Sequence, residues 1–291
     1  MDKEKQLEFV SMQKDELFRR YRKIIDKYRD IYEYNNSLDV NLDNASIRLV
    51  FAESKDDAQK WRVFSMLTTS LAGEDAVGRR LKVFVYADDM IIGMLQFCSP
   101  LAILGERDKY LHLDENKFLL LKGVYNIGSC LPIRKYAHLL TGKLLVYAAF
   151  SNEVREKLQS RYGDRVIGYE TTSLYGKSSI YNRIPFLKFL GVSKGYSAVH
   201  ISLEDWNKIK QEYFSIFPRK MGKQMGLKKY QIIDKLYKYY KKLNKPFPYE
   251  YKSTLFQRGI YFGYVIDKSL DEQIQIWRER WYFPRKERLG Q

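Results

Sequence analysis

The segment from Val166 to Ile201 constrains the fold of this chain more than any other part of the sequence. A β-type run through Glu170 leads into a turn at Gly176-Lys177-Ser178, a short helix is predicted over the letters IYNRIPF, and a second β-type run follows. Strands and helices that alternate in this way indicate an α/β domain. The same residues define a fold more firmly than they define a reaction.

The preceding residues supply more of such a domain. A short strand is predicted at Ile47–Phe51, and a helix is predicted over residues 54–71 with Ser54 as its N-cap. Two β-branched and aromatic runs then flank Ala87-Asp88-Asp89. This pattern predicts a hairpin whose paired aspartates form the turn and are not catalytic carboxylates.

A central strand and a long helix are predicted next. The apolar run KFLLLKGVYNIGSCLP has the composition of a buried strand. The residues from Arg134 to Arg161 have the length and spacing of the domain's main helix, with Gly163 near its end. The order of strand, helix and strand over residues 118–201 therefore predicts a βαβ-like central sheet.

The chain is expected to have three parts. Residues 4–34 place apolar side chains at three- and four-residue intervals among many charges, which predicts an amphipathic helix. We therefore expect a helical N-terminal arm over residues 1–45, an α/β core over residues 46–204, and a basic, aromatic-rich C-terminal extension over residues 205–291.

The positive charge is concentrated in the last third of the sequence. The chain has 51 Lys and Arg against 35 Asp and Glu, a formal net charge of +16, and the part from Asp205 onward contributes 20 basic and 9 acidic residues. Such a field favours polyanions, although a solvated lysine-rich surface would have the same composition. We predict nucleic acid as the partner, DNA in preference to RNA, and no membrane.

Lysines and tyrosines alternate in the segment from Lys228 to Leu243, whose apolar stripe predicts a helix through Ile232, Ile233, Leu236, Tyr240 and Leu243. Lysines contact phosphates and tyrosines stack on bases or sugars, but a packed helix with a solvated lysine face is an equally good interpretation of each residue. The predicted nucleic-acid-binding residues are Lys177, Lys194, Lys228, Lys229, Lys235, Lys238, Lys241 and Lys242. The terminal WRERWYFPRKERL repeats this composition.

Metal and membrane sites are not indicated. Cys98 and Cys130 lack any paired-ligand spacing, and the three histidines are scattered, so no metal is expected. The first residues are charged, and the apolar runs fall short of the ~20 residues needed to span a bilayer. The expected location is the cytoplasm.

Gly176-Lys177-Ser178 matches the end of a phosphate-binding loop. The first glycine of that motif would fall at Thr171, and the intervening Thr-Ser-Leu-Tyr cannot wrap a phosphate as glycines do. We therefore reject a nucleotide site here, while a weaker phosphate contact through Lys177 is retained.

The letters SSIYNRIPF resemble the tyrosine-containing segment of the GNAT acyltransferases. This resemblance implies a GNAT-like mixed sheet flanked by helices and a catalytic Tyr181 that protonates the leaving coenzyme A thiolate. Tyr181 could equally be a packed aromatic residue. The family's pyrophosphate-binding glycines are replaced here by the run from Cys130 to Ala137. We therefore expect no cofactor, and acetyl-CoA only if the chain is an acyltransferase.

A broader resemblance covers residues 48–202. The matching segments are Gly93 to Ser99, Arg107-Asp108, Glu170-Thr171, Tyr181-Asn182 and Leu190 to Gly195. In these segments the chain resembles the prokaryotic family that includes DruA of the Druantia anti-phage systems. It departs from the family pattern in Tyr-Asn where Asn-Trp is usual and in Ser193 where Thr is usual. The resemblance implies a defence or mobile-element context, with other defence proteins, including a helicase, as partners.

These observations lead to one main function hypothesis and two alternatives. The main hypothesis is a nucleic-acid-interacting component of a prokaryotic anti-phage defence or mobile-element system. The alternatives are a GNAT-type N-acyltransferase that uses Tyr181 and a non-enzymatic structural subunit of a defence complex. Glu170, expected where a strand leaves the sheet and opposite Lys177 and Lys194, is predicted to be either a catalytic or partner-anchoring carboxylate or a structural salt bridge.

Overall fold

The computed structural model describes residues 14–15, 17–69, 78–113, 117–173, 176–196, 199–200, 203–218, 229–249, 252–253 and 257–290. The chain divides into two compact units. The core unit comprises Val10–Lys194 and Gln257–Gln291, and the helical unit comprises Met1–Phe9 and Gly195–Phe256. Among the described residues, every helix is too short or too polar to span a bilayer.

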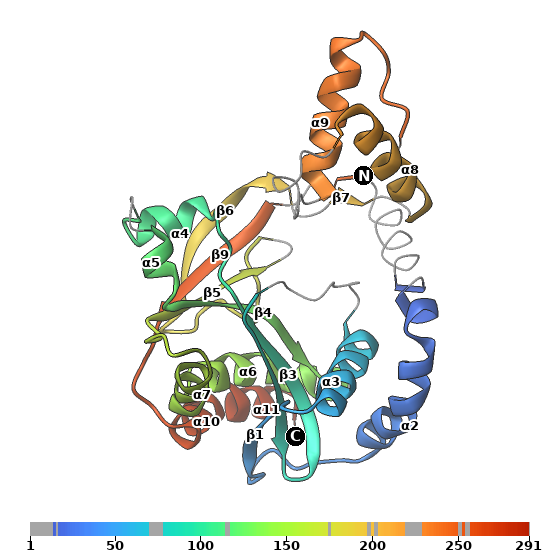
Figure 1. The fold of residues 1–291 in the computed structure, drawn as a ribbon. Coiled ribbons are helices and arrows are strands. Elements are labelled where there is room, and N and C mark those ends of the chain that lie inside the picture. Colours follow the sequence, from blue (N-terminus) through green and yellow to red (C-terminus); the bar gives the residue numbers. More distant parts are fainter. Residues whose placement is uncertain are drawn as a thin grey trace. The chain divides into compact units, whose positions relative to one another are not determined.

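The core unit is a mixed α/β fold built on a seven-stranded, mostly antiparallel sheet (Figure 1). The strand order is β1-β2-β3-β4-β5-β9-β6. Neighbouring strands from β1 to β4 are antiparallel, β4 and β5 are parallel, and β9 returns antiparallel to β5. The strands are β1 (Ile47–Phe51), β2 (Arg80–Ala87), β3 (Met90–Cys98), β4 (Val124–Pro132), β5 (Gly168–Ser173), β6 (Lys188–Tyr196) and β9 (Gln257–Tyr264).

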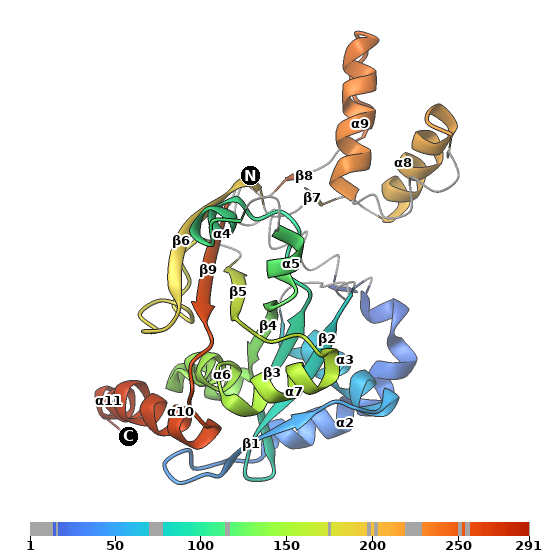
Figure 2. The ribbon, with the colours of Figure 1, turned by 60° about the vertical axis from the view of Figure 1, so that its left-hand side comes forward.

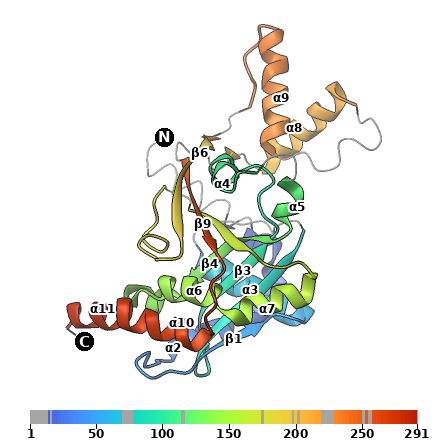
Figure 3. The same ribbon diagram turned by 90° about the vertical axis from the view of Figure 1, so that its left-hand side faces the viewer.

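Helices cover both faces of this sheet (Figures 2 and 3). Phe84 and Val85 of β2 point to opposite faces because side chains alternate along a strand. Phe84 makes an edge-on ring contact with Phe64 of α3 at 6.1 Å. Gly93 of β3 is the strand partner of Val85. Helix α6 packs so closely on this position that a Cβ added to Gly93 would lie 2.6 Å from the Leu145 side chain. The helices of the unit are α2 (Arg22–Ser37), α3 (Lys55–Thr68), α4 (Gly105–Tyr110), α5 (Lys117–Leu121), the 3-10 helix η1 (Arg134–Leu139), α6 (Thr141–Ala149), α7 (Asn152–Tyr162), α10 (Leu270–Trp277), the π-helix η2 (Arg278–Tyr282) and α11 (Phe283–Arg288).

Several elements form where local sequence signals predicted them. The strand at Ile47–Phe51 is confirmed, and the predicted helix after Ser54 begins at Lys55 with a full capping box between Ser54 and Asp57. The hairpin is also confirmed, with Asp88 in its turn at φ 51°. The amphipathic N-terminal helix is confirmed over Arg22–Ser37, while residues 4–13 lie outside the described part.

The single helix predicted from Arg134 to Arg161 is wrong. Leu140 adopts a left-handed backbone conformation with φ 60°, which separates η1 from α6, and the chain breaks again between α6 and α7. Beyond the second break, the Asn152 N–H donates to the Lys268 carbonyl oxygen at 2.8 Å, so a contact distant in sequence takes the place of a helical bond. Gly163 does end α7, at φ 76°.

Two further predictions are corrected. The first half of KFLLLKGVYNIGSCLP forms the short helix α5, and only its second half forms the buried strand β4. Arg79 donates to the Leu121 and Lys122 carbonyl oxygens at 3.4 and 2.6 Å. These hydrogen bonds supply partners for carbonyl groups at the C-terminal end of α5. The predicted helix over IYNRIPF is a series of turns in which Arg183 has a φ of 62°.

The C-terminal residues belong to the core sheet and its cover. β9 inserts between β5 and β6, and Trp277 of α10 donates its indole N–H to the Leu140 carbonyl oxygen at 3.2 Å. Thus residues 257–290, part of the expected extension, pack in the core unit. The division of the chain into an N-terminal arm, an α/β core and a C-terminal extension stays a prediction.

The helical unit has its own small apolar core. Helices α8 (Leu203–Ile216) and α9 (Lys229–Lys242) pack through Trp206, Ile209, Tyr213, Ile232, Ile233 and Leu236. The short strands β7 (Val199–His200) and β8 (Lys252–Ser253) pair antiparallel. Tyr240 of α9 donates its hydroxyl to Glu212 of α8, which ties the two helices together and contributes to raising the pKa of Tyr240 to about 12.

Candidate functional site

The structure brings residues from separate segments into one buried ionic network. Arg107 of α4 and Glu170 of β5 form an ion pair in which both side chains are 0% exposed. Glu170 lies within the sheet, paired with Asn126 of β4 and with Phe262 of β9. The expectation that it lies where the strand leaves the sheet is therefore wrong.

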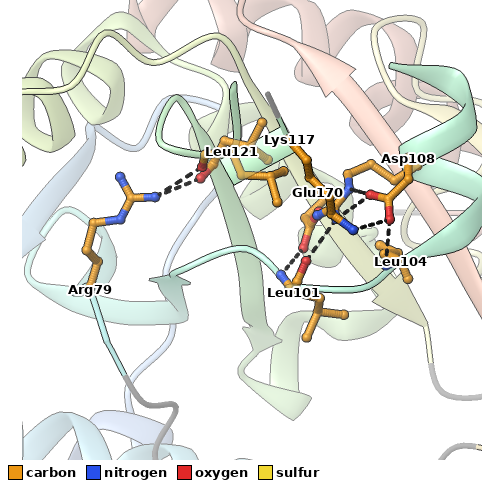
Figure 4. A network of polar contacts seen from close by, with 9 residues as sticks. Arg79, Leu101, Leu104, Asp108, Lys117, Leu121 and Glu170 are labelled. Atoms are coloured by element: carbon orange, nitrogen blue, oxygen red, sulfur yellow. Dashed lines mark hydrogen bonds and ion pairs between the residues drawn. The ribbon is translucent and has the colours of Figure 1, made fainter. Parts of the chain in front are cut away.

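The loop between β3 and α4 closes this pair (Figure 4). The Leu101 N–H donates to Oε1 of Glu170 at 2.7 Å, and Nη2 of Arg107 donates to the Leu101 carbonyl oxygen at 2.9 Å. A buried ion pair is tolerated only when such hydrogen bonds offset the loss of water. The loop is consequently held to the centre of the sheet by both charges.

Asp108 and Lys117 extend the network toward solvent. Arg107 donates to Oδ1 of Asp108 from Nε at 2.9 Å and from Nη2 at 2.6 Å. The Lys117 ammonium donates to Oδ2 of Asp108 at 2.6 Å, and the side chains of Lys117 and Asp108 are 20% and 17% exposed. The network therefore alternates in sign from the sheet to the surface, and only its Asp108–Lys117 end meets water.

The two carboxylates differ in their electrostatic environment. Burial raises the pKa of Glu170, and the charge of Arg107 and the Leu101 N–H offset this only in part. Burial also acts to raise the pKa of Asp108, but hydrogen bonds from Lys117 and Arg107 outweigh it and leave that pKa lowered. Of the two carboxylates, Glu170 therefore depends more on its buried partner, Arg107, to stay ionised.

Of the two predicted partners of Glu170, Lys177 is not the observed one. The Lys177 side chain is exposed, and its ammonium lies 5.0 Å from the centre of the Phe189 ring. The side chain of Lys194 lies outside the described part of the structure. The observed ion-pair partner is Arg107, which supports the salt-bridge alternative for Glu170. The adjacent letters Arg107-Asp108 were visible in the sequence, but a buried arginine opposite Glu170 was not predicted.

Tyr181 is buried within the core unit. Its residue is 8% exposed, and its ring lies 5.3 Å from that of Tyr261. Burial and the nearby Cys130 thiol raise the pKa of Tyr181, which keeps its hydroxyl protonated. The adjacent turn is fixed by the Tyr261 hydroxyl, which donates to Oδ1 of Asn182 at 3.0 Å. These contacts support the packed-aromatic interpretation of Tyr181 more than the catalytic one.

Helix α9 separates apolar and basic side chains by face. Ile232, Ile233 and Leu236 are 4%, 3% and 0% exposed. The opposite side carries four exposed lysines, which we call the lysine face: Lys235, Lys238, Lys241 and Lys242. Leu243, expected on the apolar stripe, is 46% exposed because it follows the end of the helix. Lys228 and the side chain of Lys229 lie outside the described part.

The aromatic residues of WRERWYFPRKERL are mostly packed in the core unit. Trp277, Trp281 and Tyr282 are 0%, 7% and 3% exposed. The Trp281 indole N–H donates to the Tyr147 hydroxyl at 3.2 Å, and the Tyr282 hydroxyl donates to Asp43 at 2.7 Å. These rings are thus unavailable for the stacking on bases that the composition suggested.

Comparison with known proteins gives two matches. The family model described as Druantia protein DruA matches residues 1–262. The chain is also similar to the Druantia protein DruA of Escherichia coli (strain UMEA 4076-1), with 29% identity over 158 residues. That alignment covers 46% of this chain and 38% of the relative, so it spans well under half of the relative's length. The family match includes the ionic network and α9 but ends before α10, η2 and α11.

Proposed function

Because the chain belongs to the DruA family, we propose that it is a component of a prokaryotic anti-phage defence or mobile-element system that binds nucleic acid through the lysine face of α9. Support for the defence context comes from the family match over residues 1–262. Other defence proteins, including a helicase, are the proposed protein partners, and DNA is preferred to RNA.

The observation that carries nucleic-acid binding is the division of α9 into a packed and a basic face. Lys235, Lys238 and Lys242 recur at three- and four-residue intervals, so they project from one side of the helix. Lys238 pairs with Asp234 at 2.7 Å, whereas Lys235, Lys241 and Lys242 form no ion pair with any described residue. Tyr237, which is 44% exposed, adds an aromatic ring beside them. Lysines without an ion-pair partner can contact phosphates, and the neighbouring Tyr237 ring can stack on a base.

Salt-dependent binding tests this proposal. Fluorescence anisotropy with labelled single- and double-stranded DNA and RNA should give affinities that fall steeply with salt, since each neutralised duplex phosphate contributes about −0.9 to the log–log slope. Lys235→Glu/Lys241→Glu/Lys242→Glu should weaken binding and flatten that slope. A matched control, Lys23→Glu/Lys55→Glu/Lys122→Glu, reverses three exposed lysines of the core unit and should retain most of the slope.

Two outcomes would contradict the proposal. One is the absence of binding to every polynucleotide at low salt, which would favour the non-enzymatic structural subunit. The other is an equal loss of nucleic-acid affinity in the control variant. That result would mean that binding depends on the net charge of the protein and not on a defined surface.

For the core unit we propose the finer GNAT-like architecture. Antiparallel strands β1 to β4, followed by a helical crossover to a parallel β5, support it. An acetyl-CoA-dependent transfer is the weaker candidate, because Tyr181 is buried and the segment from Cys130 to Ala137 lacks the glycines that cradle a pyrophosphate.

A further inference from the structure

Three cationic side chains surround one indole ring in the core unit. The Lys143 ammonium lies 4.1 Å from the centre of the Trp281 ring. The guanidinium carbons of Arg183 and Arg280 each lie 5.6 Å from the same centre. Among the residues that the structure describes, no Asp or Glu forms an ion pair with any of the three. Like charges gathered without a counter-ion repel one another and favour an anion.

Lys143 is the buried member of this group. It is 3% exposed and donates to the Asn182 carbonyl oxygen at 2.6 Å and, less closely, to that of Ile180 at 3.4 Å. An ammonium has three donors, so these two bonds leave one for a ligand. A lysine is rarely buried unless it is paired, and here its described partners are carbonyl dipoles and an aromatic ring.

Arg183 and Arg280 are exposed, and irregular backbone presents both of them. Arg183 has a φ of 62° in the turn that follows Tyr181, a conformation that costs free energy for a residue with a Cβ. Arg280 belongs to the π-helical segment η2, and such segments recur at functional sites. The two arginines are therefore exposed to solvent, whereas Lys143 and Trp281, which lie beside them, are buried.

We infer that Lys143, Arg183 and Arg280 bind a phosphate monoester beside Trp281. Three cations match a group that carries close to two negative charges, as a terminal phosphate does, better than they match the single charge of a phosphodiester. Arginine and lysine side chains form strong charge-assisted hydrogen bonds to phosphate oxygens. The ligand is either a small phosphorylated molecule or the phosphorylated end of a polynucleotide.

The site predicts a particular pH dependence. Burial lowers the pKa of Lys143 to about 8, and the charges of Arg183 and Arg280 act in the same direction. Lys143 gains its proton as the pH falls through that value, so anion binding should strengthen from pH 9 toward pH 7. Sulfate is the suitable probe for this measurement because its charge is constant over the range.

Calorimetry on the full chain tests the inference. Inorganic phosphate and sulfate should bind the wild type, and Arg183→Gln/Arg280→Gln should weaken each by at least about tenfold, because it removes the charge-assisted hydrogen bonds of both guanidinium groups. Arg29→Gln/Arg165→Gln removes two exposed arginines elsewhere in the core unit and should leave both affinities unchanged. Lys143→Met should abolish the pH dependence of sulfate binding.

The ligand source is resolved with oligonucleotides. Tighter binding of a 5′-phosphorylated oligonucleotide than of its 5′-hydroxyl twin, lost in Arg183→Gln/Arg280→Gln, assigns the site to a polynucleotide end. Equal binding of the two, together with binding of inorganic phosphate, assigns it to a small phosphorylated ligand.

The inference fails if neither phosphate nor sulfate binds the wild type at millimolar concentration, or if both arginine pairs weaken binding equally. It also fails if Lys143→Met, shown to be folded by circular dichroism, leaves the pH dependence intact. The α9 charge-reversal variant should retain phosphate binding, so this test is separate from that of the lysine face.

Discussion

Arg107 of α4 and Glu170 of β5 form an ion pair in which neither side chain has any solvent exposure. The Leu101 main chain bonds to both groups, through its N–H to Glu170 and through its carbonyl oxygen to Arg107. One ion pair thus connects a helix, a loop and a strand within the sheet. Loss of either charge leaves the other buried with incomplete compensation.

The first prediction concerns this pair. Glu170→Leu should lower the free energy of unfolding by about 3–5 kcal/mol, because breaking a buried pair leaves an uncompensated charge. Arg107→Met/Glu170→Leu should cost less than the sum of its single changes, since it removes both charges. Urea denaturation of the two single variants and the double variant measures this coupling. Additive losses would show that the pair does not act as a unit.

The second prediction concerns the isosteric change Glu170→Gln. If Glu170 is scaffold, this variant should lose defence activity in a phage-challenge assay only in proportion to its loss of stability. A folded Glu170→Gln protein with a near-native melting temperature and no activity would instead identify Glu170 as a functional carboxylate. The control variant is Glu153→Gln, which removes the carboxylate of an exposed residue in the same unit.

The third prediction concerns Asn35, which clamps α2 to the sheet. Its amide donates to the Ile91 carbonyl oxygen at 2.9 Å and accepts from the Ile91 N–H at 2.8 Å, beside a register shift between β2 and β3. Asn35→Ala should destabilise the protein by about 1–3 kcal/mol because two buried main-chain groups lose their partner. Thermal unfolding measures the loss, and the exposed Asn44→Ala should unfold like the wild type.

The fourth prediction concerns acid stability through Asp43. Its carboxylate accepts from Lys286 at 2.6 Å and from Tyr282 at 2.7 Å, and these hydrogen bonds lower its pKa. A lowered folded-state pKa means that the stabilisation is present above the unfolded pKa of about 4 and is lost as the pH falls through the folded value. Melting temperatures between pH 6 and pH 2 should therefore fall less steeply for Asp43→Asn. Parallel curves would exclude this contribution.

The fifth prediction concerns acetyl-CoA. It should not raise the melting temperature, because a ligand stabilises only a protein that binds it. Tyr181→Phe, which removes only a hydroxyl, should behave in the same way. A micromolar dissociation constant in calorimetry would restore the acyltransferase alternative.

Local signals in the sequence determined much of the secondary structure. The capping box at Ser54, the Asp88 turn and the alternation at Ile47–Phe51 are properties of a few neighbouring residues, so they could be read without a fold. The two faces of α9 likewise follow from helical periodicity. The letters around Glu170 and Arg107 also carried the resemblance to the DruA family.

Tertiary packing decided the interactions between residues that are distant in the sequence. The helix predicted from Arg134 breaks at Leu140, whose carbonyl oxygen accepts from Trp277 more than a hundred residues later. Glu170 met Arg107 and not Lys177, because strand order and burial determine which charges share a low-dielectric interior. Propensity and periodicity act over a few residues, whereas the insertion of β9 beside β5 and the gathering of three cations at Trp281 depend on how the whole chain packs.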